Sequence, residues 1–75
     1  TTVVEVNARD RPGLLARLAG VIHAAGHQLH SAHIATYGER AVDVFYLTDE
    51  SGHKLGDEAI MHLRERLLEA AAEAN

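Results

Sequence analysis

A short polar stretch between two regular patterns holds the residue types best suited to binding a small charged ligand. It reads Asp10-Arg11-Pro12-Gly13-Leu14-Leu15. Free backbone N–H groups at the start of a following helix, with the helix dipole behind them, can dock an anion such as an amino-acid carboxylate. Gly13 leaves the approach open, and the Asp10 carboxylate can accept hydrogen bonds from an ammonium or amide group. The same residues also fit a plain helix start with Pro12 at the first helical position, which is common.

The histidines are the second group of residues with possible chemistry. His30 and His33 fall on one predicted strand and His27 directly precedes it, and strand alternation places His30 on the face opposite the other two. His23 and His27 have the helical i, i+4 spacing of metal ligands, but Gly26 ends the predicted helix between them. The spacing predicts no metal site, and we interpret these residues as solvated or partly packed imidazoles that gain charge near about pH 6.

No arrangement of residues in the sequence predicts catalysis. Ser31 and Ser51 lack a nucleophile elbow, and the carboxylates are scattered over turns and the C-terminal helical pattern. Glycine-rich loops of the Walker or dinucleotide type are absent from the sequence. We therefore expect no enzyme activity from this chain by itself, with no catalytic residue, no metal-binding residue and no cofactor.

Length and composition exclude several classes of protein. The chain has 75 residues, a formal net charge of -4, no cysteine and 4% aromatic residues. The acidic balance and the few aromatic side chains argue against nucleic-acid binding, and no segment approaches the ~18–20 apolar residues of a membrane span. A domain of this size buries only about 60% of its unfolded surface. We expect it to rely on a partner or on the rest of a larger protein, and its start without Met fits a fragment.

The elements that would position the polar loop are a strand before it and a helix after it. Residues 2–8 are rich in β-branched side chains, and alternation puts every second residue from Thr2 to Ala8 on one face. After the loop, apolar residues recur at the spacing of one helical stripe. They are Leu14, Leu15, Leu18, Ala19, Ile22 and Ala25. Gly26 follows where a left-handed C-terminal cap is expected.

Two further strands are predicted over residues 28–37 and 40–48. The apolar residues Leu29, Ala32 and Ile34 of the first do not keep one parity, which predicts a bulge or burial on both faces. The second is mostly apolar on both faces. That pattern predicts a central strand whose second face is covered as well, for example by another subunit.

A long helix is predicted from about residue 57 to residue 74. Its apolar stripe consists of Ile60, Leu63, Leu67, Ala70 and Ala71. The predicted order is therefore β-α-β-β-α. This order predicts an α+β, ferredoxin-like βαββαβ sandwich with an antiparallel sheet, two helices on one face, and the fourth strand missing from this chain.

Two stretches of the sequence resemble the ACT domain, the small ligand-binding module of amino-acid and nitrogen metabolism. The loop at residues 10–15 is shared by many ACT domains, whereas SAHIATYGERAVDVFY at residues 31–46 is more specific. With VVEVN at residues 3–7, they resemble the C-terminal ACT domain of the bifunctional PII uridylyltransferase/uridylyl-removing enzymes. The resemblance covers about residues 1–74 and implies that residues 1–75 form an ACT regulatory domain.

The resemblance implies a bacterial, cytoplasmic parent enzyme with a nucleotidyltransferase domain, an HD-type hydrolase domain and two tandem ACT domains. Such an enzyme adds uridylyl groups to a PII signalling protein when nitrogen is scarce and removes them when glutamine is abundant. Catalysis and its Mg²⁺ would belong to domains outside this chain. The ACT domains would sense glutamine or another amino acid, with this chain paired to a tandem ACT copy or to a second identical domain.

The resemblance also implies a ligand pocket between the loop before the first helix and the start of the second strand of a paired domain. The implied ligand-binding residues are Asp10, Arg11, Gly13 and Leu14 on one side and Gln28 on the other. Many ACT domains carry an asparagine where Gln28 stands. The leading hypothesis is an allosteric, glutamine-sensing domain. The alternative is a ligand-free module that pairs through its sheet, and neither nucleic acid nor a membrane is an expected partner.

Overall fold

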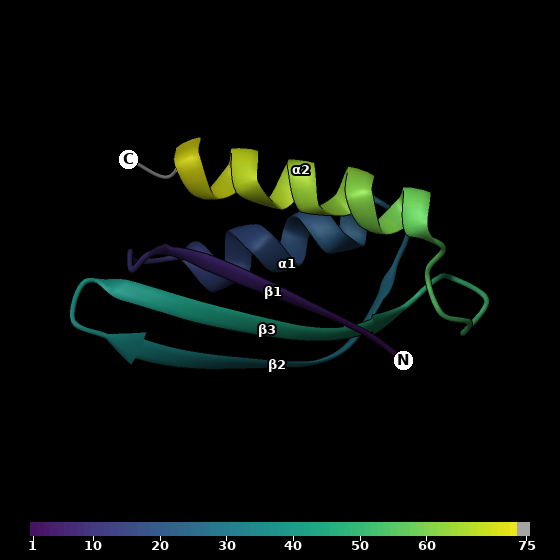
Figure 1. The fold of residues 1–75 in the computed structure, drawn as a ribbon, viewed down its shortest axis with the longest axis horizontal. Helices are drawn as coiled ribbons and strands as arrows, with labels where there is room; N and C mark the ends of the chain where they lie inside the picture. Colours follow the sequence, from purple (N-terminus) through teal and green to yellow (C-terminus); the bar gives the residue numbers. More distant parts are fainter. Residues whose placement is uncertain (74–75) are drawn as a thin grey trace.

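Three strands and two helices follow one another in the order β1–α1–β2–β3–α2 in the computed structural model, which describes residues 1–73. Their bounds are β1 Thr2–Arg9, α1 Leu14–Ala24, β2 Gln28–Tyr37, β3 Arg40–Thr48 and α2 Asp57–Glu73. The strands form one antiparallel sheet in the order β1-β3-β2, and both helices cover the same face of it (Figure 1). The predicted ferredoxin-like ACT fold is confirmed, and residues 1–73 contain no fourth strand.

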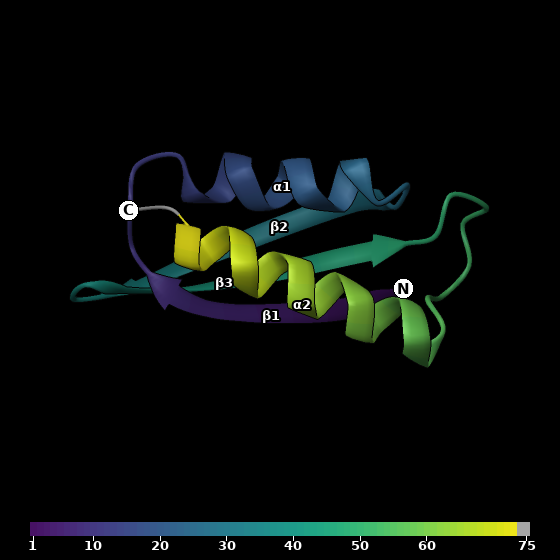
Figure 2. The ribbon, with the colours of Figure 1, turned by 90° about the horizontal axis from the view of Figure 1, so that it is seen from above.

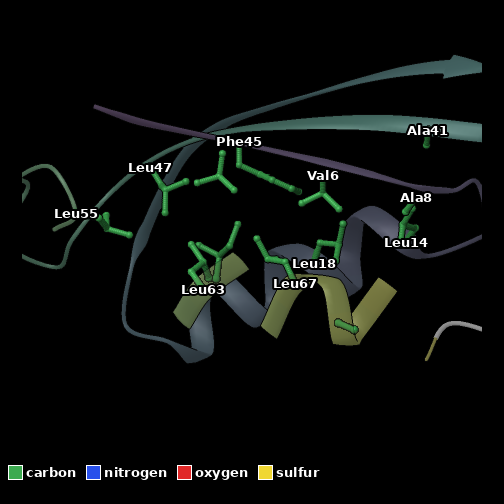
Figure 3. Packing of buried hydrophobic residues seen from close by; sticks show 13 residues of the cluster. Val6, Ala8, Leu14, Leu18, Ala41, Phe45, Leu47, Leu55, Leu63 and Leu67 are labelled. Atoms are coloured by element: carbon green, nitrogen blue, oxygen red, sulfur yellow. The ribbon is translucent and has the colours of Figure 1, made fainter. Parts of the chain in front are cut away.

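The hydrophobic core lies between the sheet and the two helices (Figure 3). Alternation along β1 buries every second residue from Thr2 to Ala8, as predicted. The core is formed by Val4, Val6, Ala8, Leu14, Leu18, Ile22, Ala41, Phe45, Leu47, Leu55, Leu63, Leu67 and Ala70. Because α1 contributes side chains from its whole length to this core, its two ends are held at fixed places over the sheet.

The central strand of the sheet is β3, which confirms the predicted central position, while the cover expected for its second face stays a prediction. Every second side chain from Ala41 to Leu47 is buried beneath the helices, and these include one charged residue, Asp43. The other face of the strand, which carries Val44 and Tyr46, is half-buried within the chain.

The edge strand β2 carries the irregularity that its sequence predicted. Its register against β3 shifts between Leu29 and Ser31, so that His30 has no partner in the ladder. A bulge of this kind leaves one extra residue on the strand and changes which face the following side chains occupy. Ile34, beyond the bulge, lies opposite Asp43 of β3.

The ends of α1 differ in part from the prediction. Pro12 is not the first helical residue, because α1 begins at Leu14, two residues later. Ala25 is exposed rather than buried, since it caps the C-terminal end of the helix. Gly26 has the expected left-handed conformation, with φ 85°.

The second helix, α2, covers most of the predicted range, and the predicted final residue 74 lies outside the described residues. Leu63, Leu67 and Ala70 of the predicted stripe are buried, while Ile60 and Ala71 pack against the core with partial exposure. Neither helix in residues 1–73 is both long and apolar enough to cross a membrane.

Candidate ligand-binding site

The chain enters α1 through a tight turn rather than through a proline-started helix. The backbone N–H of Leu14 donates to the carbonyl oxygen of Arg11 at 3.2 Å. Gly13 has φ 79° and ψ 2°, which are the values of the third residue of a type II turn, and Pro12 suits the second. A type II turn therefore places glycine where only glycine is free of strain, and it postpones the start of the helix.

The loop before this turn is fixed to the hairpin between β2 and β3. The backbone N–H of Asp10 donates to the carbonyl oxygen of Glu39 at 2.7 Å. Figure 2 shows the loop and the hairpin at the same end of the molecule, where α1 begins. The hydrogen bond holds Asp10 beside the hairpin, at the end of the molecule where α1 begins.

The first turn of α1 presents backbone donors without acceptors. The N–H of Arg17 donates to the carbonyl oxygen of Gly13 at 3.0 Å. The N–H groups of Leu15 and Ala16 have no hydrogen-bond acceptor among residues 1–73. Together with the positive end of the helix dipole, these N–H groups can bind an anion.

A pocket of about 380 Å³ lies at this end of α1. It is lined by Asp10, Arg11, Gly13, Leu14, Leu15, Ala16, Ile34, Ala41 and Asp43. Its volume falls at the small end of the range of about 300–1,000 Å³ found for small-molecule sites. Charged groups of both signs, the first turn of a helix and apolar side chains thus meet in a space that suits a small, doubly charged molecule.

Asp43 is the one charged residue of the pocket that was not among the ligand-binding residues expected from the sequence. Its side chain is 0% exposed, and neither carboxylate oxygen has a hydrogen-bond partner among the described residues. Burial, and secondly the charge of Asp10, raise the pKa of the Asp43 carboxyl. The signal available in the sequence was a single charged residue on the helix-facing, otherwise apolar side of β3.

Gln28, the fifth predicted ligand-binding residue, lies at the opposite end of α1. It lines a second depression, of about 530 Å³, together with His23, His27 and Glu50. The Nε2 of Gln28 donates to the carbonyl oxygen of Glu50 at 2.9 Å. Within one chain, therefore, Asp10, Arg11, Gly13 and Leu14 line one pocket together, and Gln28 is separated from them by the length of the helix.

The histidines on β2 take part in packing on the sheet. The Nε2 of His30 and the Oγ1 of Thr48 are 2.9 Å apart and form a hydrogen bond. The ring of His33 meets that of Tyr46 edge to face, with centroids 5.5 Å apart. No group of three or more metal-binding side chains occurs among residues 1–73.

Comparison of the sequence with known protein families shows the family to which the chain belongs. The family described as the ACR family N-terminal ACT domain matches residues 1–75. The chain belongs to this family. The expected resemblance to an ACT domain is thereby confirmed, and this ACT domain is a regulatory domain.

The curated relatives of this ACT domain are bifunctional uridylyltransferase/uridylyl-removing enzymes. The chain is 62% identical over 71 residues to the bifunctional uridylyltransferase/uridylyl-removing enzyme of Novosphingobium aromaticivorans, covering 93% of the chain. It is 52% identical over 73 residues to that of Zymomonas mobilis, covering 97% of the chain. In each case the chain spans 8% of the relative's length. The ACT domain therefore corresponds to a small part of much longer enzymes.

Proposed function

We propose that this ACT domain binds glutamine and regulates a bifunctional PII uridylyltransferase/uridylyl-removing enzyme in the bacterial cytoplasm. The observation that carries the proposal is the pocket at the N-terminal end of α1, which holds two opposite kinds of group in one small space. A helix terminus with free N–H groups favours a carboxylate, and acidic side chains favour an ammonium group or an amide. An α-amino acid carries these two poles on neighbouring atoms.

In the proposed complex, the ligand's carboxylate accepts hydrogen bonds from the backbone N–H groups of Leu15 and Ala16. The Arg11 side chain lines the same pocket and adds a positive charge to this pole. Asp10, held by its hydrogen bond to Glu39, faces the other pole of the ligand. The choice of glutamine among the amino acids rests on the likeness to the uridylyltransferase/uridylyl-removing enzymes.

The second wall of the pocket comes from a paired ACT domain in this proposal. Gln28, the first residue of β2, is too distant to reach the pocket of its own chain, because it lines the depression at the other end of α1. A second domain can bring its own Gln28 to the open side of the pocket. Binding then links two domains, and the ligand biases how they are arranged.

The consequence for the parent enzyme is allosteric control over a distance. A ligand that prefers one arrangement of the ACT pair shifts that arrangement by a coupling free energy of typically about 1–3 kcal/mol, and the effect is reciprocal between the sites. In the proposal, uridylylation of PII, removal of the uridylyl group and the Mg²⁺ that catalysis needs all belong to other domains of the parent enzyme.

A second function, pairing without a ligand, is favoured by the open face of the sheet. Val3 is 56% exposed there, and Val44 and Tyr46 beside it are only half-buried. Apolar side chains in this position favour cover by another protein surface. In this alternative the loop at residues 10–15 shapes the helix start and binds nothing.

Titration of the isotope-labelled chain with glutamine, and with glutamate as the matched control, distinguishes the two functions. The proposal expects saturable amide shifts at Gly13, Leu15 and Ala16 with glutamine and weaker shifts with glutamate. Gln28→Ala is expected to weaken these shifts only in samples that are paired. A folded, dimeric sample whose loop amides do not move at millimolar glutamine would contradict sensing by this domain and support the pairing function.

A further inference from the structure

Asp43 is a buried ionisable residue to which the fold gives no structural role that would explain its burial. It projects from the central strand between two apolar neighbours in the ladder, Val6 of β1 and Ile34 of β2. Both of its carboxylate oxygens are inaccessible and lack hydrogen-bond partners among the described residues. A buried carboxylate is costly unless hydrogen-bond donors or a cation compensate it, and apolar residues occupy the neighbouring inward positions of β3 at no such cost.

The described residues around Asp43 donate no hydrogen bond to its carboxylate. The ionisable residues that line the pocket with it are Asp10 and Arg11. The negative charge of Asp10 and the burial both raise the pKa of Asp43. A cationic group from outside the domain would counter both effects, because its charge is opposite to that of Asp43 and of Asp10.

We propose that Asp43 determines the ligand specificity of this pocket by accepting hydrogen bonds from the α-ammonium group of a bound amino acid. This inference rests on the proposed function and adds the residue that recognises the amine of the ligand. The pocket would select α-amino acids over carboxylic acids of the same shape that lack the amine. Asp43 thereby acts as the partner of one pole of the ligand, and the first turn of α1 as the partner of the other.

The positions of the pocket residues support this division. Leu15 and Ala16, whose N–H groups are free, and Asp43 line the same pocket of about 380 Å³. In an α-amino acid a single carbon atom separates the carboxylate from the ammonium group, so the two partners must lie in one small space. Because the carboxylate oxygens of Asp43 are inaccessible, a ligand can reach them only if a side chain that lines the pocket moves. Ile34 is opposite Asp43 in the ladder, lines the same pocket and is 48% exposed on the edge strand, so we expect its side chain to be the one that moves.

The test compares glutamine with 4-carbamoylbutanoic acid, which has the same carboxylate and amide but no amine. Both are titrated into the isotope-labelled chain, and dissociation constants are taken from the amide shifts of Leu15 and Ala16. For the wild-type chain we expect glutamine to bind at least tenfold more tightly. For Asp43→Asn we expect glutamine to bind at least tenfold more weakly, with little change for the deaminated compound. The matched control, Asp57→Asn on the exposed first turn of α2, removes the same charge and should bind like wild type.

The outcomes separate this inference from the proposed function. If the wild-type chain binds glutamine and the deaminated compound equally, the role of Asp43 is overturned while glutamine binding stands. The same conclusion follows if Asp43→Asn keeps the wild-type preference. If the wild-type chain binds neither compound, both the proposed function and the inference fail. Should Asp43→Asn not fold, the wild-type chain still tests the inference, because equal dissociation constants for the two compounds overturn the role of Asp43.

Discussion

The two ends of α1 lie beside two aspartates with opposite surroundings. At the N-terminal end, Asp43 is fully buried and neither carboxylate oxygen has a partner among the described residues. At the C-terminal end, Asp49 lines a depression beside Gly26. Its Oδ1 accepts hydrogen bonds of 2.9 Å from the backbone N–H groups of Ser51 and His53. One carboxylate is left unsatisfied by the fold, and the other is satisfied by its own turn.

The titration of the two aspartates follows this difference. Burial and the nearby Asp10 raise the pKa of Asp43. The pKa of Asp49 is lowered, first by the backbone hydrogen bond from His53 and further by that from Ser51, and these outweigh the opposing effect of burial. A carboxylate that receives donors from its own loop is explained by the stability of that loop. A buried carboxylate without donors, in a pocket, is a candidate for function. The difference between the two aspartates therefore supports the proposed binding at the N-terminal end of the helix and a structural role for Asp49 at the other end.

The largest effect on stability is expected from a substitution in the buried middle of α1, on which both ends of the helix depend. Leu18 is 0% exposed, in the middle of α1. We expect Leu18→Ala to lower the free energy of unfolding by about 2–5 kcal/mol, since it removes buried methyl groups and leaves a cavity. Chemical denaturation measures the loss. Leu68→Ala, at a leucine that is 56% exposed on α2, is the matched control and should change stability by less than about 0.5 kcal/mol.

Gly13 and Gly26, at the two ends of α1, test whether the ends differ in ligand binding although their backbone conformations are alike. Gly13 has φ 79° and Gly26 has φ 85°, and an added Cβ would meet no atom closer than 4.0 Å at either position. Gly13→Ala and Gly26→Ala should each cost about 1–2 kcal/mol of stability, because the left-handed conformation strains an L-residue. We expect Gly13→Ala alone to weaken the glutamine-induced amide shifts. Equal weakening by Gly26→Ala would contradict the assignment of binding to the N-terminal end.

Asp43→Asn is expected to stabilise the free domain by about 1 kcal/mol near neutral pH, because a neutral amide costs less to bury than an unpaired carboxylate. The folded-state pKa of Asp43 lies above the ordinary value of 3.8. The folded state therefore holds the proton more tightly, and wild-type stability declines as the pH rises from 3.8 through the raised pKa. The gain from the substitution should accordingly be absent in acid and appear as the pH rises through that window.

Chemical denaturation of wild type and Asp43→Asn at a series of pH values checks this expectation. Asp49 and the other carboxylates are present in both proteins, so their contributions cancel in the difference. Asp57→Asn, which removes an exposed charge, should show no comparable gain at neutral pH. A variant that is less stable than wild type at every pH would mean that the fold already compensates the Asp43 carboxylate, and the contrast between the two aspartates would be lost.

Local patterns were sufficient to predict most of the fold. The predicted strands at residues 28–37 and 40–48 agree with β2 and β3, because alternation and the turn between them are short-range signals. The bulge near His30 was visible as a break in parity. The predicted start of α1 was wrong, because Pro12 suits both the first position of a helix and the second position of a type II turn. Only the conformation of the neighbouring Gly13 distinguishes these two geometries.

The candidate site was only partly predictable. The resemblance to ACT domains indicated the loop residues, and the structure gathers Asp10, Arg11 and Leu14 around one pocket. Asp43 lies more than 25 positions away in the sequence, and its lack of donors depends on which residues surround it after folding. Strand alternation predicts that its side chain faces the helices, but no local pattern states whether a buried carboxylate will find a partner. That information exists only in the tertiary arrangement.

The smallest expected effect concerns Asp49, the satisfied member of the pair. The folded-state pKa of Asp49 lies below its ordinary value of 3.8, so its contribution to stability is present above that value and is lost as the pH falls through the folded-state pKa. Asp49→Asn keeps a side-chain oxygen for the N–H groups of Ser51 and His53 but removes its charge. We expect the variant to be slightly less stable than wild type near neutral pH and equal to it in strong acid, which is opposite in sign to Asp43→Asn. Denaturation of the two variants side by side measures both signs, and the same sign for both would mean that the two ends of α1 treat their aspartates alike.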